Sequence, residues 1–358
     1  MKEFRNFYRD KKVLVTGHTG FKGSWLSIWL KQLGADVIGI ALDPLHEKDI
    51  FNLAGISEKV TDYRQDIRDL EKIKAILARE KPEIVFHLAA QALVIPGYKN
   101  PIGTFSTNTM GTANILEACR HTASVRQIVV ITTDKVYENK EVLTGYNEED
   151  PLGGYDPYSA SKAAAELVTQ SYRLSFSQSI NQSIATARAG NVIGGGDWSE
   201  YRLVPDCIRA LEAKQPIIIR NPQAVRPWQH VLEPLSGYLL LGMNMAEGPY
   251  KYSGAWNFGP DENDLASVKD MAEMLISVWG KGKLIFDDKD TKLHETALLR
   301  LSIGKAKNIL GWKPILDFRE AVQWTVEWYK AYKNSDVYQL CSDQIEKFMN
   351  KWNSGNSI

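Results

Sequence analysis

The sequence predicts a doubly wound α/β fold, in which helices cover both faces of a parallel sheet, followed by a smaller C-terminal α/β lobe. Three observations indicate it. Short β-branched runs alternate with longer helical patterns through the first half of the chain. A glycine-rich turn directly follows the first of these runs. Beyond residue 190 the alternation weakens and proline-punctuated loops begin. Together they indicate the Rossmann type of this fold.

Buried parallel strands are expected where apolar residues form short runs, at 12–16, 36–42, 83–90, 126–133 and 183–190. Crossover helices are expected between them, at 23–33, 69–79, 107–121 and 157–176. We therefore expect residues 1–190 to form the first domain, with residues of about 225–258 returning to it. Residues 191–345 would mainly form the second lobe, and residues 353–358 a frayed tail.

The composition excludes several classes of protein. Acidic and basic residues number 43 each, so no overall charge recruits nucleic acid or a membrane surface. The three cysteines show no CxxC or Cys/His spacing, which argues against a disulfide framework and against a metal site. The chain starts with charged residues, and no apolar run approaches the roughly 20 residues of a membrane span. A cytoplasmic protein is expected.

The turn TGHTGFKG places Gly17, Gly20 and Gly23 in a GxxGxxG spacing directly after the first strand. Glycines there permit a tight turn, close approach of the backbone to a pyrophosphate, and close packing of helix on strand. Such a triplet alone is also typical of an ordinary turn. Its position between a strand and a helix favours a dinucleotide-binding loop.

The second strand ends at Asp43, where a carboxylate accepts both ribose hydroxyls of an adenosine and repels a 2′-phosphate. This favours NAD over NADP. A turn aspartate before Pro44 is the alternative, and the neighbouring His46 and Lys48 leave NADP open.

Two segments carry candidate chemistry. Tyr158 and Lys162 are four residues apart, so a helix presents both on one face. A neighbouring ammonium would lower the pKa of the phenol and allow Tyr158 to act as a general base. Alone, this spacing also occurs on solvated helices. The other segment, where the 126–133 strand ends, is Thr133-Asp134-Lys135; a surface ion pair is its alternative reading.

Six blocks occur in an order that resembles the extended short-chain dehydrogenase/reductase family: TGHTGFKG, HLAAQ, STNTMGTANILEA, TTDKVY, YxxxK and RAGNVIGGGDW. Within that family the chain is similar to the nucleotide-sugar 4,6-dehydratases, and GYDPYSASK, IIIRNP and VRPWQHVLEPLSGYL resemble the branch that acts on CDP-glucose. Dehydratases acting on dTDP-glucose carry Glu where this chain has Lys135, which supports the CDP branch and leaves the C5 base less certain.

The resemblance implies bound NAD, a CDP-sugar substrate and three chemical stages. Tyr158 would take the 4-hydroxyl proton as a hydride leaves C4, with Lys162 holding the nicotinamide ribose and Thr133 bonding the 4-oxygen. Lys135 would then remove the C5 proton, and Asp134 would protonate the departing 6-hydroxyl. The hydride would return to C6. The resemblance also implies a homodimer or homotetramer, in which the helices at 107–121 and 157–176 pack against their copies.

The binding residues that the resemblance implies fall into two sets. For NAD they are Gly17, Thr19, Gly20, Phe21, Lys22, Gly23, Asp43, Asp66, Ile67, Leu88, Ala89, Ala90, Gln91, Tyr158 and Lys162. For the nucleotide sugar they are Asn191, Arg202, Arg220, Arg226 and Arg300. Guanidinium groups suit a diphosphate. A solvated or structural role is the alternative for each arginine.

Two other functions are compatible with the fold. A nucleotide-sugar 4-epimerase also uses Tyr, Lys and bound NAD, but it needs no acid and base for C6 and C5. The Asp134-Lys135 pair therefore favours a dehydratase. A non-catalytic NAD-binding module is the other alternative, because fold alone does not establish activity. The intact set of Thr133, Tyr158 and Lys162 argues against it.

Overall fold

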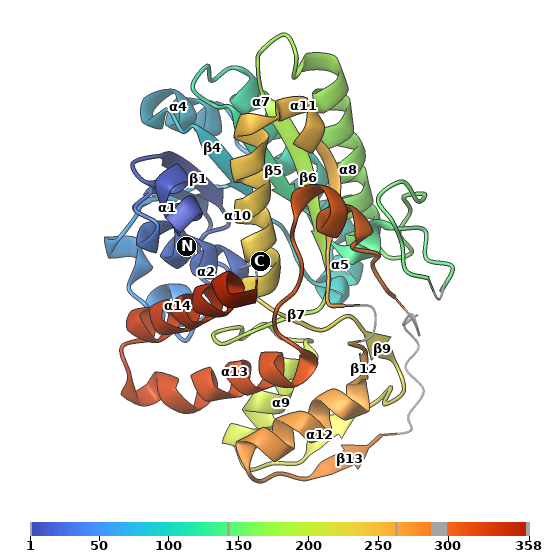
Figure 1. Ribbon diagram of the computed structural model, residues 1–358. Helices are drawn as coiled ribbons and strands as arrows, with labels where there is room; N and C mark the ends of the chain where they lie inside the picture. The colour runs from blue at the N-terminus through green and yellow to red at the C-terminus, as the bar shows by residue number, and fades with distance from the viewer. Residues whose placement is uncertain (1, 142–143, 262–263, 288–298, 356–358) are drawn as a thin grey trace.

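A seven-stranded parallel sheet forms the centre of the molecule (Figure 1). The computed structural model describes residues 2–141, 144–261, 264–287 and 299–355. The strand order is β11-β6-β5-β4-β1-β2-β3. The order reverses between β1 and β4, where a doubly wound sheet opens a crevice at the carboxyl ends of its strands. The predicted fold class is confirmed. The strands are β1 Lys12–Thr16, β2 Asp36–Ala41, β3 Thr61–Arg64, β4 Ile84–His87, β5 Gln127–Ile131, β6 Ser183–Ala189 and β11 Gly254–Phe258.

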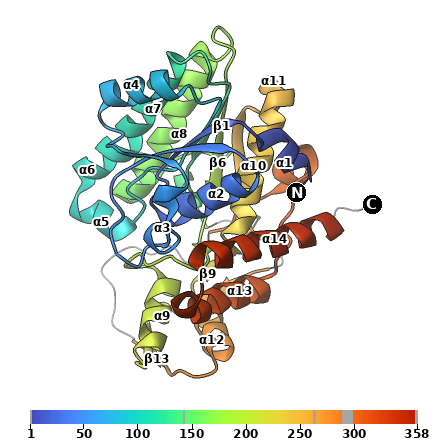
Figure 2. The ribbon, with the colours of Figure 1, turned by 90° about the vertical axis from the view of Figure 1, so that its left-hand side faces the viewer.

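Helices cover both faces of the sheet, as Figure 2 shows. Successive strand residues point to opposite faces, so that Leu14 and Val85 enter one apolar core while Val13 and Phe86 enter the other. Burial on both faces explains why the strands are continuous hydrophobic runs. One face carries α4 Leu70–Glu80, α7 Gly111–Arg120 and α8 Pro157–Phe176. The other carries α1 Lys2–Tyr8, α2 Phe21–Gln32, α10 Leu232–Glu247 and α14 Val337–Gly355.

A second group of elements lies below the sheet in Figure 1 and packs beside the carboxyl ends of the strands. Two of its helices, α9 and α12, contact strand β8, which pairs in parallel with β13. Its principal elements are α9 Leu203–Glu212, β8 Ile217–Ile219, α12 Val268–Trp279, β13 Leu284–Phe286 and α13 Phe318–Ala331. Short elements complete the chain: α3 Ile50–Leu53, α5 Val94–Lys99, α6 Pro101–Phe105, α11 Pro249–Tyr252, β7 Val192–Ile193, β9 Val225–Arg226, β10 Gln229–His230 and β12 Ala266–Ser267.

The expected elements differ from the observed ones in a few places. The helix expected at 107–121 begins earlier, because α6 continues through a π-helical turn, Ser106–Met110, into α7. Strand β3 was not predicted, because its residues do not form an apolar run: they are mainly polar and at most half-buried, as an edge strand allows. Helix α14 continues through Gly355, so residues 353–355 are helical rather than frayed, and the rest of the expected tail lies outside the described residues.

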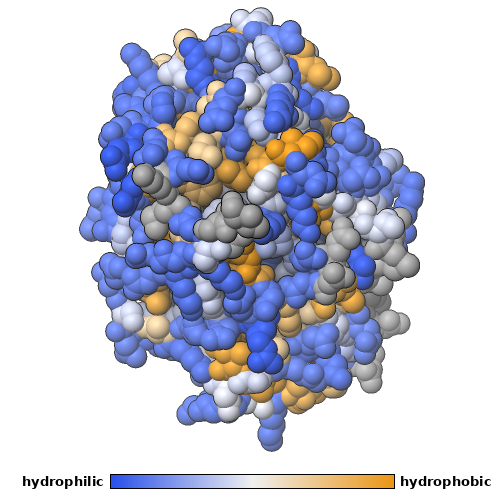
Figure 3. Space-filling model, in the orientation of Figure 1, coloured by the Kyte–Doolittle hydropathy of each residue, from blue (hydrophilic) through white to orange (hydrophobic). Residues whose placement is uncertain are grey.

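The face seen in Figure 3 is mainly hydrophilic, with small hydrophobic patches between the charged groups. No helix within the described ranges is long and apolar enough to cross a membrane.

Candidate active site

The glycine-rich turn between β1 and α2 forms a cradle that side chains would fill. Gly17 has a φ of 74°, in the left-handed region. A Cβ on Gly23 would lie 2.1 Å from the Gly17 carbonyl oxygen, and one on Gly17 would lie 2.7 Å from the Ala89 backbone nitrogen. Gly20 is the N-cap of α2 and offers no side chain to cap it. Such a helix N-terminus, approached closely by backbone alone, fits a pyrophosphate.

The candidate adenosine contacts lie at the carboxyl ends of β2 and β3. Asp43 is 86% exposed, and its Oδ1 lies 3.8 Å from Arg64 Nη1. Asp66 accepts hydrogen bonds from the Arg68 guanidinium and backbone, which lower the pKa of its carboxyl. Ile67 is buried against Gly111, where a Cβ would lie 2.5 Å from its Cδ1. These contacts fix the loop that follows β3.

The loop after β4 is held from two sides. The Leu88 and Ala89 backbone N–H groups donate to the Thr16 carbonyl and hydroxyl. The Asn108 amide accepts from the Gln91 backbone N–H at 2.8 Å and donates to the Gln91 carbonyl at 2.9 Å. Residues 88–91 therefore form a fixed floor beside the glycine cradle, where the sequence prediction places the cofactor.

Strand β5 runs directly into the candidate catalytic segment. Thr133 is extended and caps the short 3₁₀ turn Asp134–Val136. The buried Asp134 carboxylate accepts from the Thr133 hydroxyl at 2.9 Å through Oδ1, and its Oδ1 lies 4.0 Å from Lys135 Nζ. The Asp134 Oδ2 atom is buried and has no hydrogen-bond partner among the described residues. An acceptor left open beside an amine suits a group that exchanges protons with a bound molecule.

Helix α8 presents Tyr158 and Lys162 toward this segment. The helix begins where it does because Asp156 accepts from the Tyr158 and Ser159 backbone N–H groups, and Pro157 takes the first helical position. Tyr158 and Lys162 are both buried, and Lys162 Nζ donates to the Ile131 carbonyl of β5 at 3.0 Å. The predicted shared face is therefore present.

The lowered pKa that the sequence predicts for Tyr158 is wrong for this structure. Burial raises the pKa of the phenol to about 12, and the groups that oppose this rise are Thr133 and Arg202. Burial also lowers the pKa of Lys162 to about 8. Sequence reasoning missed this because burial of the phenol, which disfavours its anion, is not visible in a spacing pattern.

A cluster of positive groups borders the same site. Burial, followed by the charges of Arg202 and Lys162, lowers the pKa of Lys22 to about 7. Arg202 donates to the buried Asp197 carboxylate at 3.0 Å. Asp197 belongs to the block GGGDW, and its role as the anchor of Arg202 was not expected from the sequence. This cluster is suited to an anionic ligand.

The remaining candidate substrate residues are only partly brought together. Asn191 follows β6 with a φ of 43°, and its amide nitrogen is buried without a partner among the described residues. Arg300 lines a small cavity with Pro227, the neighbour of Arg226. Arg220, in contrast, is exposed beyond β8. Asn191 thus lies at the end of β6 and Arg300 beside the neighbour of Arg226, whereas the side chain of Arg220 is exposed.

Gly190 is a site residue that sequence reasoning missed. It follows β6, and a Cβ at this position would lie 1.8 Å from Asp134 Oδ2. The glycine in RAGN therefore makes room for the Asp134 carboxylate. The signal that could have found it is a glycine placed at the end of a buried strand, where close approach is expected.

The fold and this site define a dehydrogenase-type α/β enzyme, in which a dinucleotide cradle and a positive cluster border a Tyr–Lys pair. The family model described as GDP-mannose 4,6 dehydratase matches residues 14–325. The chain belongs to this family, which confirms its resemblance to the extended short-chain dehydrogenases/reductases.

Three relatives illustrate the similarity. A CDP-glucose 4,6-dehydratase of Salmonella typhimurium is 44% identical over 351 residues, which cover 96% of this chain and 98% of that protein. A dTDP-D-glucose 4,6-dehydratase of Homo sapiens is 27% identical and covers 89% of this chain and 90% of its own. The crystal structure of a UDP-glucose 4-epimerase of Thermotoga maritima with UDP-glucose has a TM-score of 0.78 at 25% identity, covering 90% and 100% of the two chains.

Proposed function

We propose that this protein is an NAD-dependent dehydratase that converts CDP-glucose to CDP-4-keto-6-deoxyglucose. The observation that carries the proposal is the Asp134-Lys135 pair at the end of β5, which lies in one site with Tyr158 and Lys162. The 44% identity to a CDP-glucose 4,6-dehydratase supports both the reaction and the cytidine nucleotide.

NAD is proposed to lie along the glycine cradle, its pyrophosphate at the N-terminus of α2 and its adenosine near Asp43 and Ile67. The cradle fits this group, because glycine at 17 and 23 allows a tight turn of bare backbone, and no side chain caps the N-terminus of α2 at Gly20. When bound, NAD supplies the acceptor for the C4 hydride and its later donor to C6. Lys162 is proposed to hold the nicotinamide ribose.

Tyr158 is proposed to take the proton of the 4-hydroxyl. With a pKa of about 12 the phenol is protonated at neutral pH, so it needs nearby positive charge to act as a base. Arg202 already lowers its pKa, and Lys162, with a pKa of about 8, is mainly protonated at pH 7. Thr133 lies beside the phenol and is proposed to bond the 4-oxygen.

Asp134 and Lys135 are proposed to remove water from the 4-keto sugar. The ketone acidifies the C5 proton, which the Lys135 amine takes. Protonated Asp134 donates to the 6-hydroxyl, which leaves as water while a C5–C6 double bond forms. The Oδ2 atom of Asp134 supports this role, because it is buried with no hydrogen-bond partner among the described residues and can therefore carry the proton that is donated.

The nucleotide sugar is proposed to lie between the strand ends and the second group of elements, which makes up the main part of the proposed substrate lobe within residues 191–345. Arg202, Arg226 and Arg300 would hold the diphosphate and the nucleotide, and Asn191 the sugar diphosphate. Arg220, exposed directly after β8, is proposed as a further nucleotide contact.

The enzyme is proposed to be a cytoplasmic homodimer or homotetramer. Supporting it, apolar side chains are exposed on adjoining helical segments: Ile102 is 79% exposed, Met110 57%, Leu167 55% and Leu174 75%. An isologous contact would bury them. A wild-type protein of monomeric mass at micromolar concentration contradicts the proposal, whereas dissociation of an oligomer by Leu174→Glu supports it.

Isotope transfer tests the reaction. CDP-glucose deuterated at C4 is expected to give a product with deuterium at C6, and reaction in heavy water is expected to label C5. A 4-epimerase returns the deuterium to C4, retains the 6-hydroxyl and leaves C5 unlabelled. UDP-glucose and dTDP-glucose serve as matched substrates that test which nucleobase the enzyme prefers. A product that keeps its 6-hydroxyl refutes the dehydratase.

A further inference from the structure

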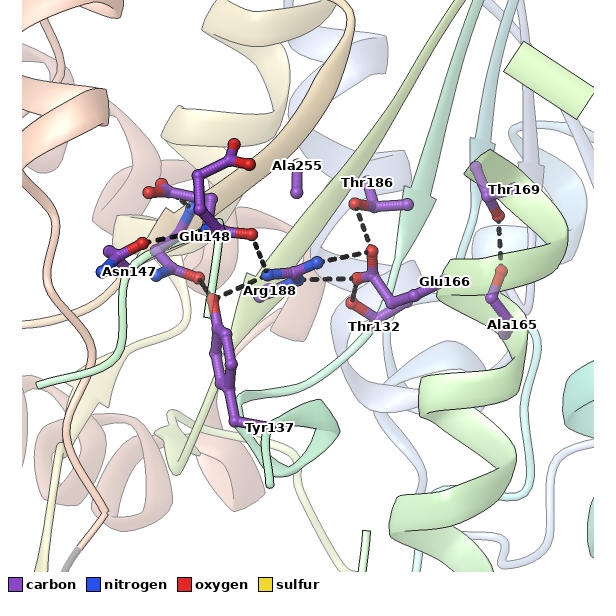
Figure 4. A network of polar contacts seen from close by, with 12 residues as sticks. Thr132, Tyr137, Asn147, Glu148, Ala165, Glu166, Thr169, Thr186, Arg188 and Ala255 are labelled. Carbon is purple, nitrogen blue, oxygen red and sulfur yellow. Dashed lines mark hydrogen bonds and ion pairs between the residues drawn. The ribbon is translucent and has the colours of Figure 1, made fainter. Parts of the chain in front are cut away.

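Glu166 is a buried carboxylate on α8, one turn beyond Lys162, and the reaction proposed above does not use it. Its side chain is 4% exposed. Oε1 accepts from the Thr132 hydroxyl and from Arg188 Nε, and Oε2 accepts from the Thr186 hydroxyl and from Arg188 Nη2. Figure 4 shows these groups converging on one carboxylate. Four donors compensate for the burial of its charge.

The carboxylate joins α8 to the strand that ends in the catalytic segment. Thr132 donates to Glu166, while the carbonyl of the preceding Ile131 accepts from Lys162 Nζ at 3.0 Å. The last residue of β5 and the residue that follows it are therefore bonded to two side chains one turn apart on α8. Thr133 and Asp134 follow directly, so this double contact sets their position relative to Lys162.

Arg188 connects Glu166 to the segments that carry Tyr137 and Glu148. It is 3% exposed, and its Nη1 donates to the Tyr137 hydroxyl at 2.8 Å and to the Glu148 carbonyl at 3.2 Å (Figure 4). The Tyr137 hydroxyl donates to Asn257 Oδ1, and Asn257 Nδ2 donates to the Ser302 carbonyl at 3.1 Å. The same network thus reaches the segment that carries Arg300.

We propose that Glu166, held by Arg188, is a positioning residue of this active site, which fixes the Thr132–Asp134 strand end against the Tyr158–Lys162 helix. The inference rests on the proposed function for its kinetic consequences. Glu166 acts through its neighbours and touches no reacting atom.

Thr132→Val is the mildest test, since it removes the hydroxyl bonded to Glu166 and leaves the Glu166–Arg188 pair intact. Misplacing the strand end is expected to lower kcat for CDP-glucose by about 10- to 100-fold while KM stays near the wild-type value. Thr132→Ser restores the hydroxyl and is expected to restore kcat. Thr169→Val is the matched control, because its buried hydroxyl lies on the same helix and, among the described residues, bonds to the Ala165 carbonyl of that helix.

Glu166→Gln tests the charge of the pair. The charged and titratable groups that act on or are affected by Lys162 are Glu166 on α8, Lys22 on α2 and His87 on β4. Of these, Glu166 opposes the effect of burial and raises the pKa of Lys162. The variant is therefore expected to titrate Lys162 at a lower pH than the wild type, measured by NMR of ¹⁵N-labelled lysine with Lys162→Met for assignment.

The outcomes separate this inference from the proposed function. A wild type that does not turn over CDP-glucose refutes the function, and the NMR titration still decides whether Glu166 controls Lys162. Turnover by the wild type with equal kcat in Thr132→Val and Thr169→Val overturns the positioning role. So does a Thr132→Val defect that Thr132→Ser does not rescue, or an unchanged Lys162 titration in folded Glu166→Gln.

Discussion

Replacing Gly190 by alanine tests the role of the Asp134 carboxylate through a contact that the structure measures. The added Cβ would lie 1.8 Å from Asp134 Oδ2, about 1.6 Å inside the 3.4 Å at which ordinary van der Waals contact begins. Gly190 directly follows the buried strand β6, so its backbone is held by the sheet. The short Asp134 side chain is therefore expected to move instead. A displacement of about 1 Å typically costs about 10²-fold in rate, or about 2.7 kcal/mol of barrier.

We expect Gly190→Ala to slow water elimination by about 10²-fold and to affect C4 oxidation less. Single-turnover experiments with CDP-glucose should then show that reduced cofactor, detected by its absorbance, accumulates before the 6-deoxy product appears. Gly304→Ala is the control, since its Cβ would meet only Ser302 Oγ, at 3.7 Å. Elimination at the wild-type rate in folded Gly190→Ala would show that Asp134 does not serve as the acid.

Three further predictions follow from the site and the core. Tyr158→Phe should lower C4 oxidation by roughly 10²–10⁴-fold while NAD affinity, measured by calorimetry, is retained; near-normal turnover excludes Tyr158 as the base. The wild type should bind NAD more tightly than NADP, and Asp43→Ala should narrow this difference in affinity. Equal affinities of the wild type for NAD and NADP contradict the proposal that Asp43 binds the adenosine ribose. Burial raises the pKa of Glu233 to about 8, so its contribution to stability should fall as pH rises from about 4.5 to 8. In urea unfolding, the free energy of unfolding should fall less over this pH range in Glu233→Gln than in the wild type. Equal falls in the two proteins refute the raised pKa of Glu233.

The sequence predicts the parts of the site that depend on local pattern. The run at 12–16 and the helix at 157–176 occur as expected, because a buried strand is a continuous apolar run and because Asp156 and Pro157 mark a helix start. The glycine turn has the predicted close contacts. These features need only neighbouring residues.

Features that depend on distant contacts could not be predicted in this way. Gly190 meets Asp134 because β5 and β6 are adjacent in the sheet, and Arg188 meets Glu166 because α8 packs on β6. The high pKa of Tyr158 results from burial by the assembled fold. No spacing within either segment encodes these effects. The positions of the candidate substrate arginines likewise depend on how the loops after β6 return to the sheet.

The return of the chain to the sheet at β11 limits how this protein can be divided. All seven residues of β6 are buried, and β11 pairs with it along its carboxyl half, from Ala185 to Ala189. A fragment ending near residue 190 would lack both β11 and the α10 helix that covers the sheet, leaving β6 as a bare, apolar edge. Exposed edges of that kind pair with other chains. The nucleotide-binding half is therefore expected to aggregate when expressed alone, and a split version would need residues 232–258 supplied on the same polypeptide or as a complementing fragment.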